Sequence, residues 1–197
     1  TATLSVVSSD NVTVTLTGSG TSTAGTDYAS LSTITIIAGS TTGTTTFNPT
    51  DDSVYEGSET AIIAITGVSG GSATESGTQS KTITITDSLA APTASLSSSA
   101  SSVSEKASDL TLTATLNRST YETVTVTLST SGTSTDGTDY ASLSSITISA
   151  GSTTGTTTFN PTSDTLFENS ETAIIAINTV SGGGATESGT QSVTIAI

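Results

Sequence analysis

Carboxylates are the side chains of this sequence that are most able to do chemistry. The 197 residues include 17 Asp and Glu but only three Lys and Arg, and they contain no His and no Cys. Nucleophilic catalysis lacks its usual base, because no histidine is present to activate the many serines. The acids are also unevenly placed. Eleven of them fall at turns between apolar runs: Asp27, Asp51, Asp52, Glu56, Glu59, Asp87, Glu105, Asp139, Asp164, Glu168 and Glu171.

Crowded carboxylates repel one another unless a cation neutralises them. Calcium takes six to eight oxygen ligands and therefore suits such a set, whereas magnesium prefers octahedral sites that keep several waters. Zinc, copper and iron–sulfur sites lose their favoured ligands when His and Cys are absent. Asp is also common in turns because its side chain hydrogen-bonds nearby backbone. The residues alone leave both interpretations open, calcium ligands or solvated turns.

The elements that must position these acids come in two copies. The tetrapeptide Gly-Thr-Asp-Tyr at 25–28 returns at 137–140, an offset of 112 residues. Residues 1–85 align with 113–197 without a gap, and 63 of the 85 pairs are identical. Such a repeat predicts two domains of one kind. We expect a first module over 1–88, a linker over 89–92 and a second module over 93–197.

Alternation of Val or Ile with Thr, as at 12–16 and 83–85, predicts β-strands with one apolar face. The second module should have seven strands, at 93–104, 110–116, 123–130, 143–149, 155–160, 172–178 and 191–197. The first should have six, at 1–7, 12–18, 31–37, 43–48, 60–66 and 79–86. This spacing predicts an all-β chain of two tandem immunoglobulin-like antiparallel β-sandwiches, the first without its N-terminal strand. Alternating strand directions would then bring the eleven acids to one end of their modules.

Particular residues also resemble a known family. Gly-Thr-Asp-Tyr at 25–28, Asp51 and Asp52 with Glu56 and Glu59, and a closing Asp87 resemble the Calx-beta module. Val-Ser-Glu at 103–105 resembles the opening acid of that family. The resemblance implies an immunoglobulin-like sandwich that binds calcium at the end facing the next domain. Such modules occur in sodium–calcium exchangers, integrin β4 and bacterial surface proteins.

The sequence departs from the family pattern at four points. Ser163 replaces the first acid of the Asp pair in the second module, and a single Asp87 stands where the family often has two acids. The first module lacks the counterpart of Glu105, and the second lacks the counterpart of Asp87. These departures put full occupancy of either calcium site in doubt.

Charge and composition exclude several partners. A net charge of −14 disfavours nucleic acid and anionic membrane surfaces, and no apolar run is long enough to insert into a bilayer. The pair Glu56 and Glu59 could serve a glycosidase, but no aromatic platform for a sugar accompanies it. We therefore expect no enzymatic activity.

Three functions are compatible with these observations. The first is a spacer repeat of an extracellular surface adhesin or matrix protein, stiffened by calcium and partnered by further copies in tandem. The second is a filament subunit, in which a neighbouring chain supplies the strand missing from the first module. The third is a pair of calcium-sensing domains, which the near identity of the two copies disfavours.

Overall fold

The computed structural model describes residues 1–165 and 169–197, and the regular elements within them are all β-strands. Glu168, one of the predicted ligands, lies outside the described residues. The chain forms two compact units, Thr1–Asp52 with Ser58–Ser88, and Ser53–Gly57 with Leu89–Ile197. A search of the described part of the chain finds no helix with the length and hydropathy needed to cross a membrane.

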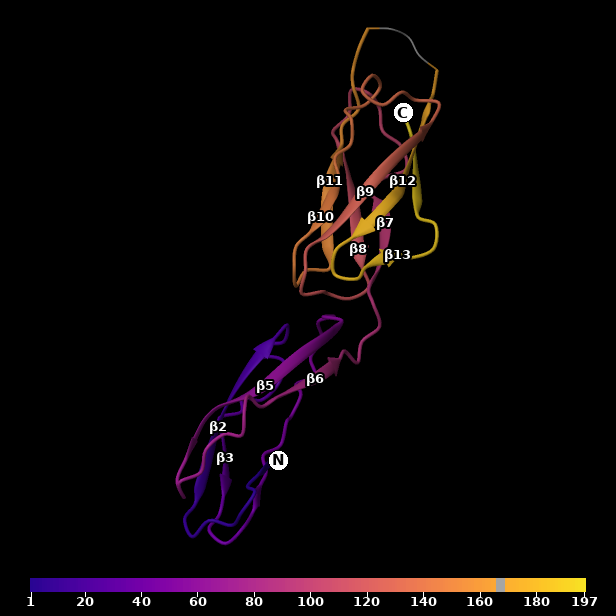
Figure 1. Cartoon of the computed structure of the whole chain (residues 1–197). Helices are drawn as coiled ribbons and strands as arrows, with labels where there is room; N and C mark the ends of the chain where they lie inside the picture. Colours follow the sequence, from indigo (N-terminus) through magenta and orange to yellow (C-terminus); the bar gives the residue numbers. More distant parts are fainter. Residues whose placement is uncertain (166–168) are drawn as a thin grey trace. The chain divides into compact units, whose positions relative to one another are not determined.

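The second unit has two four-stranded sheets (Figure 1). One sheet has the order β10 (Ile146–Ile148), β9 (Val124–Gly132), β12 (Thr172–Ser181) and β14 (Ser192–Ala196). The other has the order β11 (Thr154–Phe159), β8 (Leu110–Leu116), β7 (Thr93–Ser98) and β13 (Thr186–Glu187). Neighbouring strands are antiparallel except β13 and β7, which run parallel. The predicted antiparallel sandwich is confirmed.

The core of the second unit follows from the alternation of apolar residues and threonines. In β8 the leucines and Ala114 are buried while the intervening threonines are not. Leu112 meets Ile175 and Ile195 in one cluster, and all three are fully buried. Tyr140 stacks on Phe159 with ring centroids 4.7 Å apart, and both rings are buried. This arrangement anchors the loop that carries Asp139, the residue before Tyr140.

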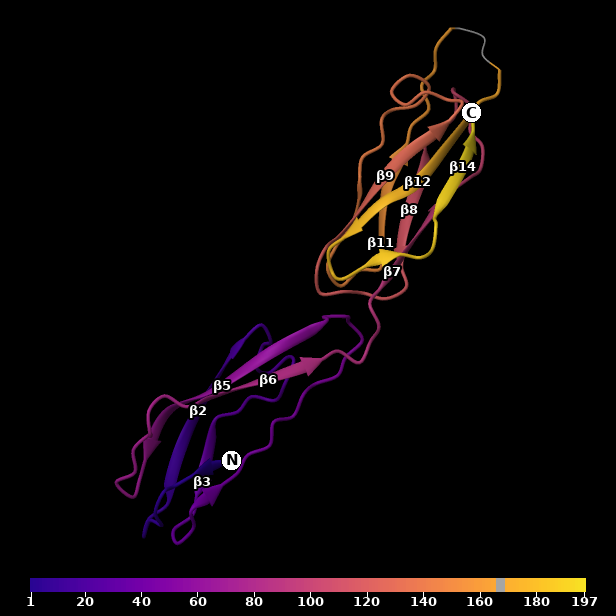
Figure 2. The same cartoon turned by 45° about the vertical axis from the view of Figure 1, so that its right-hand side comes forward.

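The first unit has the same plan with a smaller second sheet (Figure 2). Its four-stranded sheet has the order β3 (Thr33–Ile36), β2 (Val12–Gly20), β5 (Ser58–Ser69) and β6 (Ser80–Thr86). Facing it is only the pair β1 (Ala2–Thr3) and β4 (Thr42–Gly43). Within residues 1–88, all of which are described, no strand occupies the position that β7 has in the second unit, as predicted.

Several predicted strands are shorter in the structure. Those predicted at 31–37, 143–149 and 191–197 are reduced to Thr33–Ile36, Ile146–Ile148 and Ser192–Ala196, and the two that form the small sheet of the first unit are the shortest. The strand predicted at 1–7 is only Ala2–Thr3, and that at 43–48 is only Thr42–Gly43. Strands need neighbours on which to hydrogen-bond, and β1 has a partner on one edge only.

The strand predicted at 93–104 is shorter for another reason. It ends at Ser98 because the chain then moves to the other sheet. There Ser102 bridges Ala196 in parallel, and the Val103 N–H donates to the Ala196 carbonyl at 2.8 Å.

Candidate metal centre

Asp27 is positioned by a tight loop that follows β2. Its N–H donates to the Thr23 carbonyl at 2.9 Å, and its carboxylate accepts the Thr23 N–H at 2.5 Å. Gly25 adopts a φ of +90° in this loop, which a side chain would disfavour. The next residue, Tyr28, is buried and stacks on Phe47 with centroids 4.8 Å apart. The core thus holds the loop, and the loop holds a carboxylate that is only 8% exposed.

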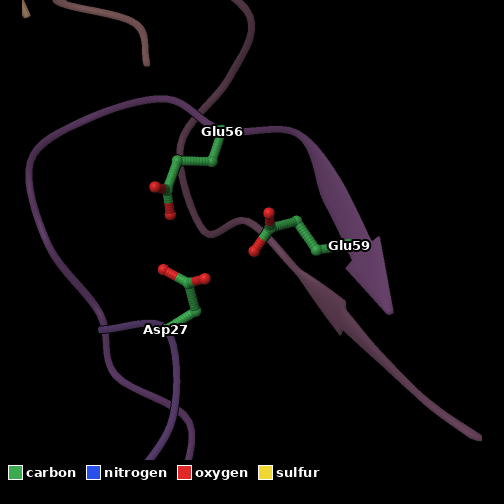
Figure 3. Close-up of side chains that lie close together, drawn as sticks. All are labelled: Asp27, Glu56 and Glu59. Carbon is green, nitrogen blue, oxygen red and sulfur yellow. The ribbon is translucent and has the colours of Figure 1, made fainter. Parts of the chain in front are cut away.

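Asp27, Glu56 and Glu59 form an acidic cluster (Figure 3). Each offers one carboxylate oxygen, and these atoms all lie within 4.8 Å of one another. Glu56 comes from the loop before β5 and Glu59 from the start of β5 itself, and both are half-buried. The three side chains point toward a common centre in Figure 3. The cluster therefore concentrates negative charge where solvent screens it incompletely.

The electrostatics of Glu59 reflect this crowding. Burial raises the pKa of Glu59 above its ordinary value, and the nearby charge of Asp27 raises it further. A side-chain hydrogen bond with Asp27 and the charge of Asp87 act in the same direction. The raised pKa means that Glu59 holds a proton more readily in the folded chain than in the unfolded chain. A bound cation would supply the same neutralisation without the proton.

The remaining predicted ligands of the first module are Asp51, Asp52 and Asp87. Asp87, half-buried just after β6, is close enough for its charge to act on Glu59. Asp51 is exposed and accepts a hydrogen bond from the Ser88 hydroxyl at 2.7 Å, while Asp52 is also exposed. Of the predicted residues that the structure describes, Asp27, Glu56 and Glu59 have carboxylate oxygens close enough to one another to share a metal ion.

The second module repeats the loop that positions Asp27, but no cluster like that of Asp27, Glu56 and Glu59 is found among its described residues. The Asp139 carboxylate accepts the Thr135 N–H at 2.6 Å, as Asp27 does from Thr23. Glu171 is half-buried and pairs through its backbone with Ile197, while Asp164 is exposed and Glu105 half-buried. No group of three acids is found here among the described residues, which exclude Glu168, the counterpart of Glu56.

Two contributors were missed by sequence reasoning. The Thr23 amide orients Asp27, and the Ser88 hydroxyl holds Asp51 beside the end of β6. The first had a sequence signal, since Thr precedes Asp by four residues in both copies, at 23 and at 135. Ser88 offered none, because nothing in its spacing distinguishes it from the other serines.

Comparison with known proteins agrees with this architecture. The family model of the Calx-beta domain matches residues 3–89 and again 90–197. The chain belongs to the Calx-beta family. No match was found among the curated proteins.

Two solved structures resemble the tandem Calx-beta pair at low sequence identity. One, described as CBD12 from CALX1.2, is 14% identical with a TM-score of 0.44, and the match covers 99% of this chain and 90% of that chain. Another, described as the calcium binding domain CBD12 of CALX1.1, is 14% identical with a TM-score of 0.41 and coverages of 96% and 88%.

The donor set of the first Calx-beta domain, residues 3–89, fits a hard cation. Its cluster offers only carboxylate oxygens, which calcium accepts in mono- or bidentate fashion. Three carboxylates supply part of the six to eight oxygens that calcium takes, so water or the acids nearby would complete the shell. Asp27 is buried, and its carboxylate accepts the Thr23 N–H, so a cation in this cluster would neutralise a charge that is costly to bury.

Proposed function

We propose that this chain is a non-enzymatic structural repeat of an extracellular surface adhesin or matrix protein, stiffened by calcium. The observation that carries the proposal is the convergence of Asp27, Glu56 and Glu59 within 4.8 Å. Calcium there would join the loop after β2 to the start of β5 and so restrain this end of the sandwich. Its partners would be copies of the same module, in tandem or in neighbouring chains. Extracellular modules work with weak sites of roughly 10⁻⁴–10⁻³ M because the surrounding calcium is high.

A thermal melt with a chelator and with about 1 mM calcium tests the proposal. A ligand that binds the folded state alone, with a Kd of about 10⁻⁴ M, adds about 1.4 kcal/mol at this concentration. We expect the first unit to melt several degrees higher in calcium. Glu59→Gln should abolish the rise. Asp10→Asn removes the same charge from an exposed acid outside the cluster and should retain it.

The calcium-sensor alternative makes a different prediction in the same titration. A sensor should bind calcium tightly and cooperatively, with a large change in conformation. A spacer should bind calcium weakly, with a rise in melting temperature but little change in conformation. Equal melting with calcium and with chelator would contradict both.

A second candidate function is assembly of an extracellular filament by strand complementation. The observation that favours it is an open groove of about 920 Å³ in the first unit, at the position that β7 fills in the second. An unpaired sheet edge can accept a strand from another polypeptide. Ordered polymers in electron micrographs would support this function, and amorphous aggregates or monomers would contradict it.

A further inference from the structure

The groove of the first unit is lined by residues that should belong to a core. Its apolar walls include Leu4, Leu16, Phe47, Ile63, Ile65 and Ile83. All six are only half-buried, although they face between the sheets. Such an opening into the interior of a sandwich leaves apolar surface in water, which is unfavourable.

The second unit shows what closes this groove. Its counterparts of Phe47, Ile63 and Ile83, each 112 residues later, are fully buried: Phe159, Ile175 and Ile195. The strand that covers them is β7, whose Ala94 and Leu96 point into the core, 0% and 7% exposed. The groove therefore has the chemistry of a slot for one strand, not of a pocket for a small polar molecule.

The contacts that hold β7 are specific. On one side it pairs antiparallel with β8, and on the other it runs parallel to β13. Three backbone hydrogen bonds hold the start of this segment: the Asn117 N–H donates to the Thr93 carbonyl, the Thr186 N–H to the Pro92 carbonyl and the Ser188 N–H to the Ala94 carbonyl, at 2.9–3.1 Å. At the same offset the first unit presents the amides of Ser5, Thr74 and Ser76, all of which line the groove.

A glutamine supplies one more contact, and its side chain is held by the same hydrogen bond in both units, from Nε2 to the carbonyl of the serine three residues before it. In the second unit the Gln191 Oε1 accepts the Leu96 N–H at 3.4 Å. Its counterpart Gln79 lines the groove, and its Nε2 donates to the Ser76 carbonyl at 2.7 Å. This bond holds the amide of Gln79 in place, and its oxygen is the atom that can accept an incoming backbone N–H.

We infer that this groove binds the leading segment of another copy of the repeat, as an extended strand in the register of β7. The Ala of that segment would pair with Leu4 and its Leu with Ala2, because Ala94 pairs with Leu116 and Leu96 with Ala114. The leading segment of the second module, residues 92–104, carries no charged side chain. A chain of net charge −14 therefore does not repel it. This inference identifies the partner strand for the filament function proposed above. Strand binding itself does not require that function, but the assembly of filaments from bound chains does.

Binding is measured with a fluorescent peptide of residues 92–104 titrated into the 197-residue chain. We expect saturable one-to-one binding, weakened about tenfold or more in a peptide with Leu96→Asp, which loses the burial of that side chain. In the chain, Gln79→Ala should weaken binding about three- to tenfold through the lost hydrogen bond. Gln191→Ala is the matched control, since its groove is already filled, and it should leave peptide affinity unchanged.

Hydrogen exchange locates the peptide. The amides of Ser5, Thr74 and Ser76 should exchange more slowly with peptide bound, while their counterparts in the second unit stay the same. A second chain with a copy of residues 92–112 fused before Thr1 should melt higher and no longer bind the free peptide.

Three results would each overturn the inference: no saturable binding, equal binding of the Leu96→Asp peptide, or undiminished binding to the fused chain. Peptide binding without polymers in electron micrographs would keep the inference and reject the filament function.

Discussion

The hydroxyl of Tyr28 lies over Gly18, so close that a Cβ atom on Gly18 would stand 2.1 Å from the hydroxyl oxygen. This hydroxyl is buried and has no hydrogen-bond partner among the described residues. In the second unit Thr130 takes the place of Gly18, its side chain contributes to the pKa of Tyr140, and the Tyr140 hydroxyl is not one of the buried atoms without a partner. One repeat thus satisfies its buried tyrosine and the other does not.

Tyr28→Phe and Tyr140→Phe should therefore differ in their effect on stability. We expect Tyr140→Phe to lower the free energy of unfolding of the second unit by about 1 kcal/mol, the usual loss for one hydrogen bond. Tyr28→Phe removes a buried group without a partner and should leave the first unit unchanged or more stable. Urea denaturation of the two variants checks this, and equal losses would show that the Tyr28 hydroxyl is satisfied in solution.

The pH dependence of the first unit should depend on calcium. The pKa of Glu59 is raised in the folded state, so the folded chain binds more protons there than the unfolded chain. Without metal, its contribution to stability should fall as pH rises from the ordinary glutamate pKa through the raised folded value. With calcium, which needs the ionised acid, calcium-dependent stabilisation should grow over the same range.

Melting curves at several pH values, in chelator and in calcium, separate these trends. Glu59→Gln should remove the decline of stability with pH in chelator. A decline that survives this substitution would assign it to another acid. Raising the salt concentration is a further check, because part of the shift comes from neighbouring charges that salt screens.

Substitution of equivalent isoleucines should change the free energy of unfolding by different amounts in the two units. Ile175→Ala should cost about 2–5 kcal/mol, because it opens a cavity in a closed core. Ile63→Ala, on the wall of the groove, removes a half-buried side chain and should cost less than half as much. Denaturation of both variants tests this, and a comparable loss would mean that the groove is closed in solution.

Two glycines with positive φ should respond differently to alanine. Gly151 has a φ of +75° and open space around its Cα, so Gly151→Ala should cost about 1 kcal/mol from backbone strain alone. Gly132 has a φ of +117°, and a Cβ there would stand 2.1 Å from the Thr172 carbonyl oxygen. Gly132→Ala should cost about 1–3 kcal/mol more. Similar losses in calorimetry would show that the β9–β12 pair adjusts freely.

The sequence predicted the sandwich because periodicity and repetition are local signals. Alternation placed a strand at 172–178, and the structure has it at Thr172–Ser181. The division of the segment predicted at 93–104 between two sheets was not predictable, since it depends on pairing with Ala196, which lies 94 positions after Ser102. The shortening of the strand at 1–7 likewise depends on an absent neighbour and not on its own composition.

The candidate site was predictable in part. Residue type and spacing identified the loops that carry Asp27, Glu56 and Glu59, and the structure brings these three together. Spacing could not tell them from Asp51 and Asp52, which are exposed. That distinction depends on burial, which arises from how the loops pack.

The parallel bridge between Ser102 and Ala196 has a mechanical consequence. The Val103 N–H donates to the Ala196 carbonyl, and the Ala196 N–H donates to the Ser101 carbonyl at 3.0 Å. When the two ends of the second unit are pulled apart, parallel neighbours slide past each other, so these bonds bear the load together and do not open one by one. Residues 1–88 form no such parallel pair between a leading strand and β6. In single-molecule pulling the second unit should therefore resist tension and the first should extend at lower force.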